Sequence, residues 1–400
     1  MKKKWLSLLL VICLLLYIPH ECRATEIKDS ELYARSACLL DADSGRVLYN
    51  KNAYEQMPMA STTKIMTCIL ALELAHLDDV VTVSANAVSQ PPVKMNAQEG
   101  EQFLLSDLLY ALMLNSYNDV AVMVAEHVGG SVEAFAEKMN LKARELGCED
   151  TYFITPSGLD AQDAYGQHST TAVDLAKIMK YCITESPQKE LFLEITRMPS
   201  YTFWNQSQTQ SYNCTNHNSF LTMMDGALTG KTGFTSQAGY CYVGALEWEG
   251  KTFVVSLLAC GWPNNKGYKW SDTKKLMLYG LRNYEYEDVF KHEELELVEV
   301  ENGICDDTQI GQCAEVEVVY GIDQEDITYD VLLKQDEEVE VVYQIPDSIE
   351  APVLKGQQIG TVQYFLNGEL LREYPVYAKN EVKERDYFWC LEKIKEAYQV

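Results

Sequence analysis

The sequence predicts two regions of different fold class, an α+β region followed by a small all-β domain. Up to about residue 290, helical patterns mix with a few strand patterns, and no β-α-β rhythm connects them. From 294 to 377, short alternating strands are separated by turns. A last stretch carries apolar residues at helical spacing. We therefore expect an α+β region at 25–290, a β-rich domain at 291–378 and an amphipathic helix at 379–400.

The first 24 residues have the pattern of a secretory signal peptide. Three lysines precede the short apolar run Trp5–Leu16, and Cys22-Arg23-Ala24 is a small-x-small cleavage site. The run is shorter than a membrane span, so a retained anchor is the less favoured alternative. Removal of residues 1–24 takes away a net charge of +3 and changes the formal charge from −26 to −29. We expect a secreted protein.

Composition excludes several partners and sites. A strongly acidic surface repels nucleic acid, so we expect no nucleic-acid partner. No CxxC pair is present, which argues against a zinc ribbon or a thioredoxin-type centre, and we predict no metal and no cofactor. Cysteines within apolar runs are expected to be free core thiols. Cys305 and Cys313 could bridge a hairpin, but sequence does not define the pairing.

Local patterns predict the individual elements. Residues 36–41 and 45–49 read as a hairpin, because the intervening turn is rich in Asp and ends in Gly45. Helices are expected at 61–72, 104–114, 120–128, 131–146, 170–183 and 274–284, and strands at 239–246 and 252–260. In the β-rich domain, strands are expected at 295–300, 314–320, 327–333, 338–343, 360–366 and 370–377.

The most informative stretch is 59–72, in which Ser61 and Lys64 begin an apolar helix. Residues at i and i+3 are neighbours on a helix surface, so the amine can reach the hydroxyl. The helix N-terminus favours negative charge, and burial lowers the pKa of the amine, so a neutral lysine can activate the serine as a nucleophile. By itself the pattern is weak, because Ser-x-x-Lys recurs at Ser186 and Ser271, where a loop and an N-cap are expected.

Two further motifs follow in order. Ser116-Tyr117-Asn118 lies between two predicted helices, where a hydroxyl and an amide can point into a cleft. Lys231-Thr232-Gly233 occurs once, on a predicted strand, with Lys231 and Gly233 on one face. The lysine and the threonine hydroxyl suit a carboxylate, and the glycine permits close approach of a substrate to the backbone.

The three motifs in this order are the set found in penicillin-binding proteins and serine β-lactamases. The surrounding segments 115–121, 153–160, 168–175 and 230–235 resemble secreted D-alanyl-D-alanine carboxypeptidases, and the resemblance covers about residues 30–285. The stretch 351–360 resembles the β-domain that many of them carry. The resemblance implies a penicillin-binding/β-lactamase-like catalytic domain, peptidoglycan stem peptides as substrates, β-lactams as ligands, and action at the cell wall or the outer face of the cytoplasmic membrane.

The resemblance also implies the catalytic roles. Ser61 would attack the carbonyl of the penultimate D-alanine and become acylated, and Lys64 would take its proton. Ser116 would relay a proton to the departing D-alanine. Water would then release the shortened peptide.

The remaining site residues would bind the substrate. Asn118 would hold the substrate amide, and Lys231 and Thr232 would bind the terminal carboxylate beside Gly233. Backbone N–H groups of Ser61 and Phe234 would form the oxyanion hole.

Some points stay open from sequence. Some relatives place His after Lys-Thr-Gly, whereas this chain has Phe234, which leaves substrate preference and deacylation rate undefined. His168 and Asp174 read as structural residues. The alternatives to a carboxypeptidase are a serine β-lactamase and a catalytically decayed wall-binding protein. The C-terminal helix either packs on the protein or makes a peripheral membrane contact.

Overall fold

The structure is a computed structural model that describes residues 26–291, 294–304, 311–322 and 327–398. The chain divides into two compact units, Met1–Asn283 and Tyr284–Val400. The predicted signal peptide lies outside the described residues. Within the described part, no helix is long and apolar enough to cross a membrane.

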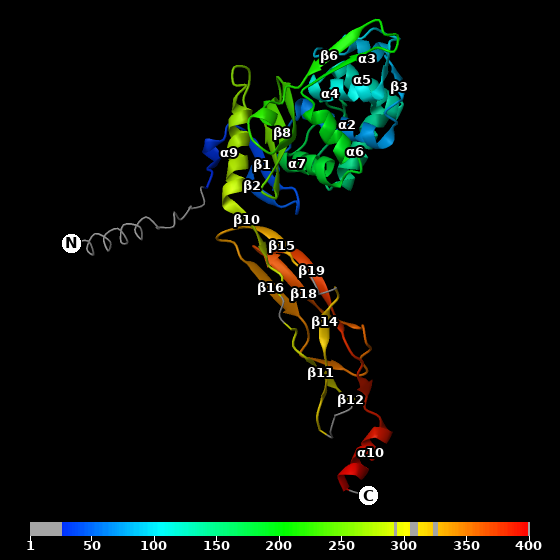
Figure 1. The fold of residues 1–400 in the computed structure, drawn as a ribbon, viewed down its shortest axis with the longest axis vertical. Coiled ribbons are helices and arrows are strands. Elements are labelled where there is room, and N and C mark those ends of the chain that lie inside the picture. The colour runs from blue at the N-terminus through cyan, green and yellow to red at the C-terminus, as the bar shows by residue number, and fades with distance from the viewer. Residues whose placement is uncertain (1–25, 292–293, 305–310, 323–326, 399–400) are drawn as a thin grey trace, which may run out of the picture. The chain divides into compact units, whose positions relative to one another are not determined.

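A five-stranded antiparallel sheet forms the centre of the first unit (Figure 1). Its strand order is β2-β1-β9-β8-β7, which leaves β7 at an edge. The strands are β1 (Ser36–Asp41), β2 (Val47–Lys51), β7 (Ala227–Thr235), β8 (Gly239–Trp248) and β9 (Lys251–Leu258). Helices α9 (Tyr268–Asn283) and α7 (Ala172–Lys180) cover its two faces.

A helical cluster packs beside this sheet and shares its core. Its central helix, α2 (Lys64–Leu74), is almost wholly buried because the sequence after Lys64 is nearly all apolar. The other helices are α3 (Ala85–Ser89), α4 (Leu105–Leu114), α5 (Asn118–Gly129), α6 (Val132–Glu145) and α8 (Lys189–Arg197). Two hairpins border the cluster: β3 (Val80–Thr82) with β4 (Gln102–Leu104), and β5 (Ser200–Trp204) with β6 (Ser211–Thr215). Short helical turns η1 (Asp29–Glu31), η3 (Tyr181–Glu185) and η4 (Ser219–Thr222) complete the unit.

The second unit is all-β apart from its last helix. A four-stranded sheet has the order β14-β19-β18-β16, and a three-stranded sheet has the order β13-β11-β17. Two strand pairs, β10-β15 and β12-β20, complete it. The strands are β10 (Tyr284–Asp288), β11 (Val298–Glu301), β12 (Gly303–Ile304), β13 (Ala314–Val316), β14 (Val318–Tyr320), β15 (Asp330–Lys334), β16 (Val339–Gln344), β17 (Ser348–Glu350), β18 (Gln358–Leu366), β19 (Glu369–Ala378) and β20 (Lys383–Glu384). The α+β and all-β fold classes are therefore confirmed.

Two boundaries differ from the predicted ones. Along the chain, the first unit ends at Asn283 and the second begins at Tyr284 with β10, whereas the sequence placed residues 284–290 in the first region. The reason is that β10 pairs with β15 over its whole length. The last helix, α10 (Tyr387–Tyr398), begins later than residue 379 because Lys383–Glu384 forms a strand with β12.

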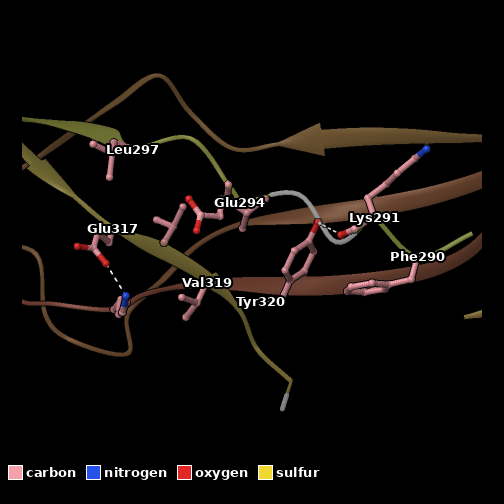
Figure 2. Close-up of a pocket in the computed structure, with 10 residues that line it drawn as sticks. Phe290, Lys291, Glu294, Leu297, Glu317, Val319 and Tyr320 are labelled. Carbon is pink, nitrogen blue, oxygen red and sulfur yellow. Dashed lines mark hydrogen bonds and ion pairs between the residues drawn. The ribbon is translucent and has the colours of Figure 1, made fainter. Parts of the chain in front are cut away.

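The second unit holds a cavity of about 610 Å³ (Figure 2). An ion pair of 2.6 Å between Lys379 Nζ and a carboxylate oxygen of Glu317 lies at its border. None of the predicted site residues lines this cavity. All nine described cysteines after the predicted signal peptide are free thiols and seven of them are buried, whereas Cys305 lies outside the described residues.

Candidate active site

Ser61 lies in a single 3₁₀ turn, η2 (Ala60–Thr63), immediately before α2. The expectation that the α-helix begins at Ser61 is therefore wrong by one turn. Ala60 has a left-handed φ of +50°, and the Thr62 and Thr63 hydroxyls donate to the carbonyl oxygens of Met59 and Ala60. These bonds satisfy carbonyls that would otherwise accept in an α-helix, and they hold Ser61 on a tight corner.

Lys64 is the first residue of α2 and its side chain is fully buried. Its Nζ donates to Ser61 Oγ at 2.9 Å, to Asn118 Oδ1 at 3.0 Å and to the Ser157 carbonyl oxygen at 2.7 Å. Desolvation, assisted by the charge of Lys231, holds the pKa of Lys64 well below its usual range, while Asp119 opposes the shift. Lys64 is thus a buried amine, poised to be neutral, in contact with a serine hydroxyl.

The Ser116–Asn118 segment joins α4 to α5 and faces this amine. Ser116 adopts a left-handed φ of +62°, a strained conformation for a residue with a Cβ. Asn118 begins α5, and besides accepting from Lys64 it donates from Nδ2 to the Pro91 carbonyl oxygen at 3.2 Å. Asn115 braces the segment from the other side, since it donates to the Tyr117 hydroxyl and accepts from the Thr215 N–H.

A buried carboxylate adds a second brace to this segment. Asp119 accepts the backbone N–H groups of Met95 and Asn96 at 2.9 and 3.0 Å. These bonds tie the start of α5 to the loop that carries the Pro91 carbonyl. Asn118 is consequently positioned by its neighbours in sequence as well as by Lys64.

Strand β7 supplies the opposite wall of the site. Lys231 is 3% exposed, and its Nζ donates to Ser116 Oγ at 2.9 Å and to the Thr232 carbonyl oxygen at 3.0 Å. Burial lowers the pKa of Lys231 to about 7. Thr232 is half-buried and lies on the same strand, next to Lys231. The site thus contains two lysine–serine pairs, because Lys64 contacts Ser61 and Lys231 contacts Ser116.

The next two residues of β7 reach the nucleophile turn and the surface. A Cβ on Gly233 would lie 2.9 Å from the Ser61 nitrogen and 3.0 Å from the Ala60 Cβ, so a side chain here would displace the turn. Phe234 is 39% exposed, and its ring centroid lies 4.6 Å from that of Tyr240. All eight predicted site residues therefore belong to η2 and the start of α2, the α4–α5 junction, or β7.

Sequence reasoning assigned no role to the loop 155–160 beyond its resemblance to relatives, whereas in the structure this loop supports the nucleophile turn. The Ser157 carbonyl accepts from Lys64, and the Pro156 carbonyl accepts from the Thr67 hydroxyl at 2.7 Å. Gly158 has a φ of +84°, and a Cβ there would lie 1.9 Å from the Ala60 carbonyl oxygen. The signal was the Pro-Ser-Gly turn itself, but backbone carbonyls have no residue type by which a sequence could identify them.

His168 serves the same loop and is structural, as expected. Its Nδ1 accepts the Ile154 N–H at 3.0 Å, so its Nε2 carries the proton and donates to the Thr63 hydroxyl at 2.9 Å. Burial, with the charge of Lys64, lowers the pKa of His168 to about 4, so the ring is neutral. Asp174, also expected to be structural, accepts from the Thr151 hydroxyl and the Asp150 N–H. Among the described residues, no group of His, Cys, Asp and Glu is arranged to hold a metal ion.

The arrangement has the parts of an acyl-transfer site: a hydroxyl beside a buried amine, and a second hydroxyl bonded to a second buried amine that an edge strand supplies. Comparison with known proteins agrees with it. The family model for D-alanyl-D-alanine carboxypeptidase, peptidase S11, matches residues 23–258. A second one, for the C-terminal domain of penicillin-binding protein 5, matches residues 306–384.

Individual relatives match over nearly the whole chain. The Bacillus subtilis D-alanyl-D-alanine carboxypeptidase DacF is 28% identical over 404 residues, which are 98% of each chain. The Escherichia coli D-alanyl-D-alanine carboxypeptidase DacC is 29% identical and covers 94% of this chain and 91% of its own.

Solved structures show the same architecture. Penicillin-binding protein 5 of Haemophilus influenzae superposes with a TM-score of 0.67 at 26% identity, over 90% of this chain and 100% of that chain. Penicillin-binding protein D2 of Listeria monocytogenes, solved with cefotaxime bound, has a TM-score of 0.55 at 29% identity, over 64% of this chain and 99% of that chain. The fold, the family matches and the order of the three motifs agree, and the chain belongs to the D-alanyl-D-alanine carboxypeptidase family, peptidase S11.

Proposed function

We propose that the protein is a serine carboxypeptidase that removes the terminal D-alanine from peptidoglycan stem peptides through an acyl-enzyme on Ser61. The observation that carries the proposal is the contact of 2.9 Å between Ser61 Oγ and the fully buried Nζ of Lys64. A serine hydroxyl becomes a nucleophile when an adjacent base accepts its proton, and a desolvated lysine is such a base.

The acylation step follows from these contacts. Ser61 Oγ attacks the carbonyl carbon of the penultimate D-alanine while its proton passes to Lys64. The C–N bond to the last D-alanine then breaks, and Ser116 gives its proton to the leaving amine. Lys231 Nζ, which donates to Ser116 Oγ, is in position to restore that proton. A water molecule later attacks the Ser61 ester, which releases the shortened peptide and the free hydroxyl.

Substrate binding and charge stabilisation fall to β7 and to α5. The charge of Lys231 and the hydroxyl of Thr232 bind the terminal carboxylate, and Asn118 binds the amide of the substrate. The backbone N–H groups of Ser61 and Phe234 bind the developing oxyanion, and the close approach of Gly233 to the Ser61 nitrogen supports their convergence. A β-lactam presents a similar amide and carboxylate, so we expect it to acylate Ser61.

Mass spectrometry of the purified protein tests this proposal. With penicillin, we expect a mass increase equal to one drug molecule, located on the peptide that contains Ser61. With diacetyl-Lys-D-Ala-D-Ala, we expect release of D-alanine. Ser61→Ala should abolish both. If the variant and the wild-type protein behave alike, the reading of a decayed wall-binding protein replaces the proposal, and rapid turnover of nitrocefin would favour a β-lactamase.

We further propose that the protein is secreted and that α10 touches the membrane surface. The described residues of α10 are not buried, and Tyr387, Phe388 and Tyr398 are among its most exposed aromatic side chains. Exposed aromatic residues on an amphipathic helix suit the membrane interface. Co-sedimentation of the full chain with phosphatidylglycerol vesicles, compared with a chain ending at residue 386, tests this: equal binding would refute the contact.

A further inference from the structure

The hairpin of β5 and β6 lies in an uncharged segment of the chain. Residues 198–224 contain no Asp, Glu, Lys or Arg, and no other stretch without these residues is as long. Charged residues make up 23% of the sequence, so a stretch of this length ordinarily carries about six of them. Asn, Gln, Ser, Thr and aromatic residues take their place. In a protein with a formal charge of −26, this segment is polar but neutral.

Alternation along the two strands gives the hairpin an inner and an outer side. The inner residues are buried or half-buried: Tyr201, Phe203, Tyr212 and Cys214. The outer residues are all exposed, so their hydroxyl, amide and indole N–H groups are accessible to a ligand. We call this outer side the hairpin face, and it consists of three cross-strand pairs: Ser200 with Thr215, Thr202 with Asn213, and Trp204 with Ser211.

The inner side holds the hairpin against α4 at the border of the helical cluster (Figure 1). The Tyr201 ring stacks on that of Tyr110, with centroids 3.9 Å apart, and its hydroxyl donates to Asp107 Oδ1 at 2.8 Å. The Tyr212 hydroxyl donates to Glu101 Oε2 at 3.2 Å. Two neighbouring carboxylates are thus bound on the side opposite the hairpin face. A hairpin fixed in this way loses little conformational entropy when a ligand binds.

One end of the hairpin face adjoins the active site. The Thr215 N–H donates to Asn115 Oδ1 at 2.8 Å, and Asn115 directly precedes Ser116. The other end is formed by Trp204 and Ser211, which lie about 14 Å from Thr215 at a rise of about 3.4 Å per residue. The hairpin face therefore begins beside the Ser116 side of the site and is long enough for a short oligosaccharide.

The chemistry of the hairpin face suits a neutral sugar chain. The apolar C–H face of a pyranose ring packs on an indole, and Trp204 is 47% exposed. Sugar hydroxyl and acetamido groups exchange hydrogen bonds with Ser, Thr and Asn side chains. A nucleic acid or an acidic peptide would need cations here, and a basic peptide would need carboxylates. A protein partner would need a larger apolar centre than one Trp.

We propose that the hairpin face binds the sugar backbone of a peptidoglycan strand. The choice of polymer rests on the proposed carboxypeptidase function, which places the end of the substrate peptide at Lys231, in contact with Ser116. The hairpin face begins at this end, so the bound strand is a neighbour of the one whose peptide is cleaved. The contact holds an acidic enzyme on its polymer, because interactions between neutral groups are not screened by salt.

Peptide-free glycan tests the surface without any catalysis. The probes are N-acetylglucosamine oligosaccharides and glycan strands whose stem peptides an amidase has removed, and the affinity is measured by calorimetry. For the wild-type protein we expect saturable binding that does not weaken with added salt. Trp204→Ala should weaken the binding about tenfold, and Asn213→Ala about threefold, through the lost ring contact and the lost hydrogen bonds.

The matched control is Trp248→Ala. Trp248 is 42% exposed and lies at the end of β8, outside the hairpin face. We expect this variant to bind glycan as the wild-type protein does. Penicillin labelling and the unfolding temperature show whether each variant is folded. If the wild-type protein binds neither glycan, or if Trp204→Ala and Trp248→Ala bind equally well, the inference is overturned.

Release of D-alanine separates this inference from the proposed function. We expect the rate on intact peptidoglycan, divided by the rate on a soluble D-Ala-D-Ala peptide, to fall about threefold or more in Trp204→Ala and to stay unchanged in Trp248→Ala. An unchanged ratio in Trp204→Ala would overturn a role of the hairpin face on the polymer. If the wild-type protein binds glycan but releases no D-alanine from either substrate, the proposed function fails while the sugar-binding surface stands.

Discussion

Replacement of Gly158 by Ala tests whether the loop 155–160 holds the nucleophile turn. A Cβ at this position would lie 1.9 Å from the Ala60 carbonyl oxygen and 2.8 Å from the Thr63 hydroxyl. Both partners belong to η2, which is buried, so the loop and the turn must separate by about 1 Å to reach an allowed contact. The movement pulls the Ser157 carbonyl away from Lys64 Nζ.

The expected magnitudes follow from this displacement. A left-handed φ costs a residue with a Cβ about 1–2 kcal/mol, and the disturbed hydrogen bonds of Lys64 and Thr67 add about 1–2 kcal/mol. A total of about 3 kcal/mol corresponds to a fall in unfolding temperature of about 6–12 °C for a unit of this size. A displacement of about 1 Å in catalytic geometry costs about 100-fold in rate.

Gly250→Ala is the matched control. Gly250 has a similar φ of +76° in the β8–β9 turn, but no atom lies within 4 Å of a Cβ placed there. We expect it to lower the unfolding temperature by about 2–8 °C, through the cost of its φ alone, and to leave acylation unchanged. The assays are thermal unfolding and the rate of labelling by a fluorescent penicillin. If Gly158→Ala labels as fast as Gly250→Ala, the loop does not position the nucleophile.

Three further substitutions probe separate contacts. His168 is neutral in the folded state, because its pKa is about 4 there against 6.5 in the unfolded chain, so its contribution to stability is present above pH 6.5 and is lost as the pH falls to 4. In denaturant unfolding, we expect the fall in unfolding free energy between pH 6.5 and pH 4 to be about 3 kcal/mol smaller for His168→Gln than for the wild-type protein. An equal fall in both proteins would contradict this. Asp119→Asn replaces one carboxylate oxygen by an NH₂ group, so a donor faces a backbone N–H that the oxygen accepted from. We therefore expect a loss of about 1–3 kcal/mol in unfolding free energy and slower penicillin acylation, and an unchanged free energy and acylation rate would exclude a bracing role. Thr232→Val should raise KM for the D-Ala-D-Ala peptide about tenfold through the lost carboxylate contact, whereas an unaltered KM would place the carboxylate elsewhere.

The site was largely predictable because its chemistry depends on side chains at defined spacings. Ser61 and Lys64 are close because both lie at one helical start, and Lys231 and Gly233 share a strand face. The contact between Lys231 and Ser116 joins residues 115 positions apart, and only the resemblance to a family connected them.

The parts that sequence did not predict are carried by backbone atoms and short elements. The Ser157 and Pro91 carbonyls accept from Lys64 and Asn118, and any residue type supplies a carbonyl. Strands β12, β17 and β20 have two or three residues each, too few to show an alternating pattern. The start of α2 was misplaced because hydroxyl bonds to Met59 and Ala60 shape the preceding turn.

The three partners of Lys64 also determine the direction in which its lone pair points. As an ammonium, Lys64 has three hydrogens and donates one to each of Ser61 Oγ, Asn118 Oδ1 and the Ser157 carbonyl. Two of these acceptors are carbonyl oxygens, which have no proton to offer in return. Once the amine is neutral, its two remaining hydrogens keep these bonds, and the lone pair faces the serine hydroxyl. The polarity of the Ser61–Lys64 bond can therefore reverse without any rotation of the side chain and before a substrate arrives.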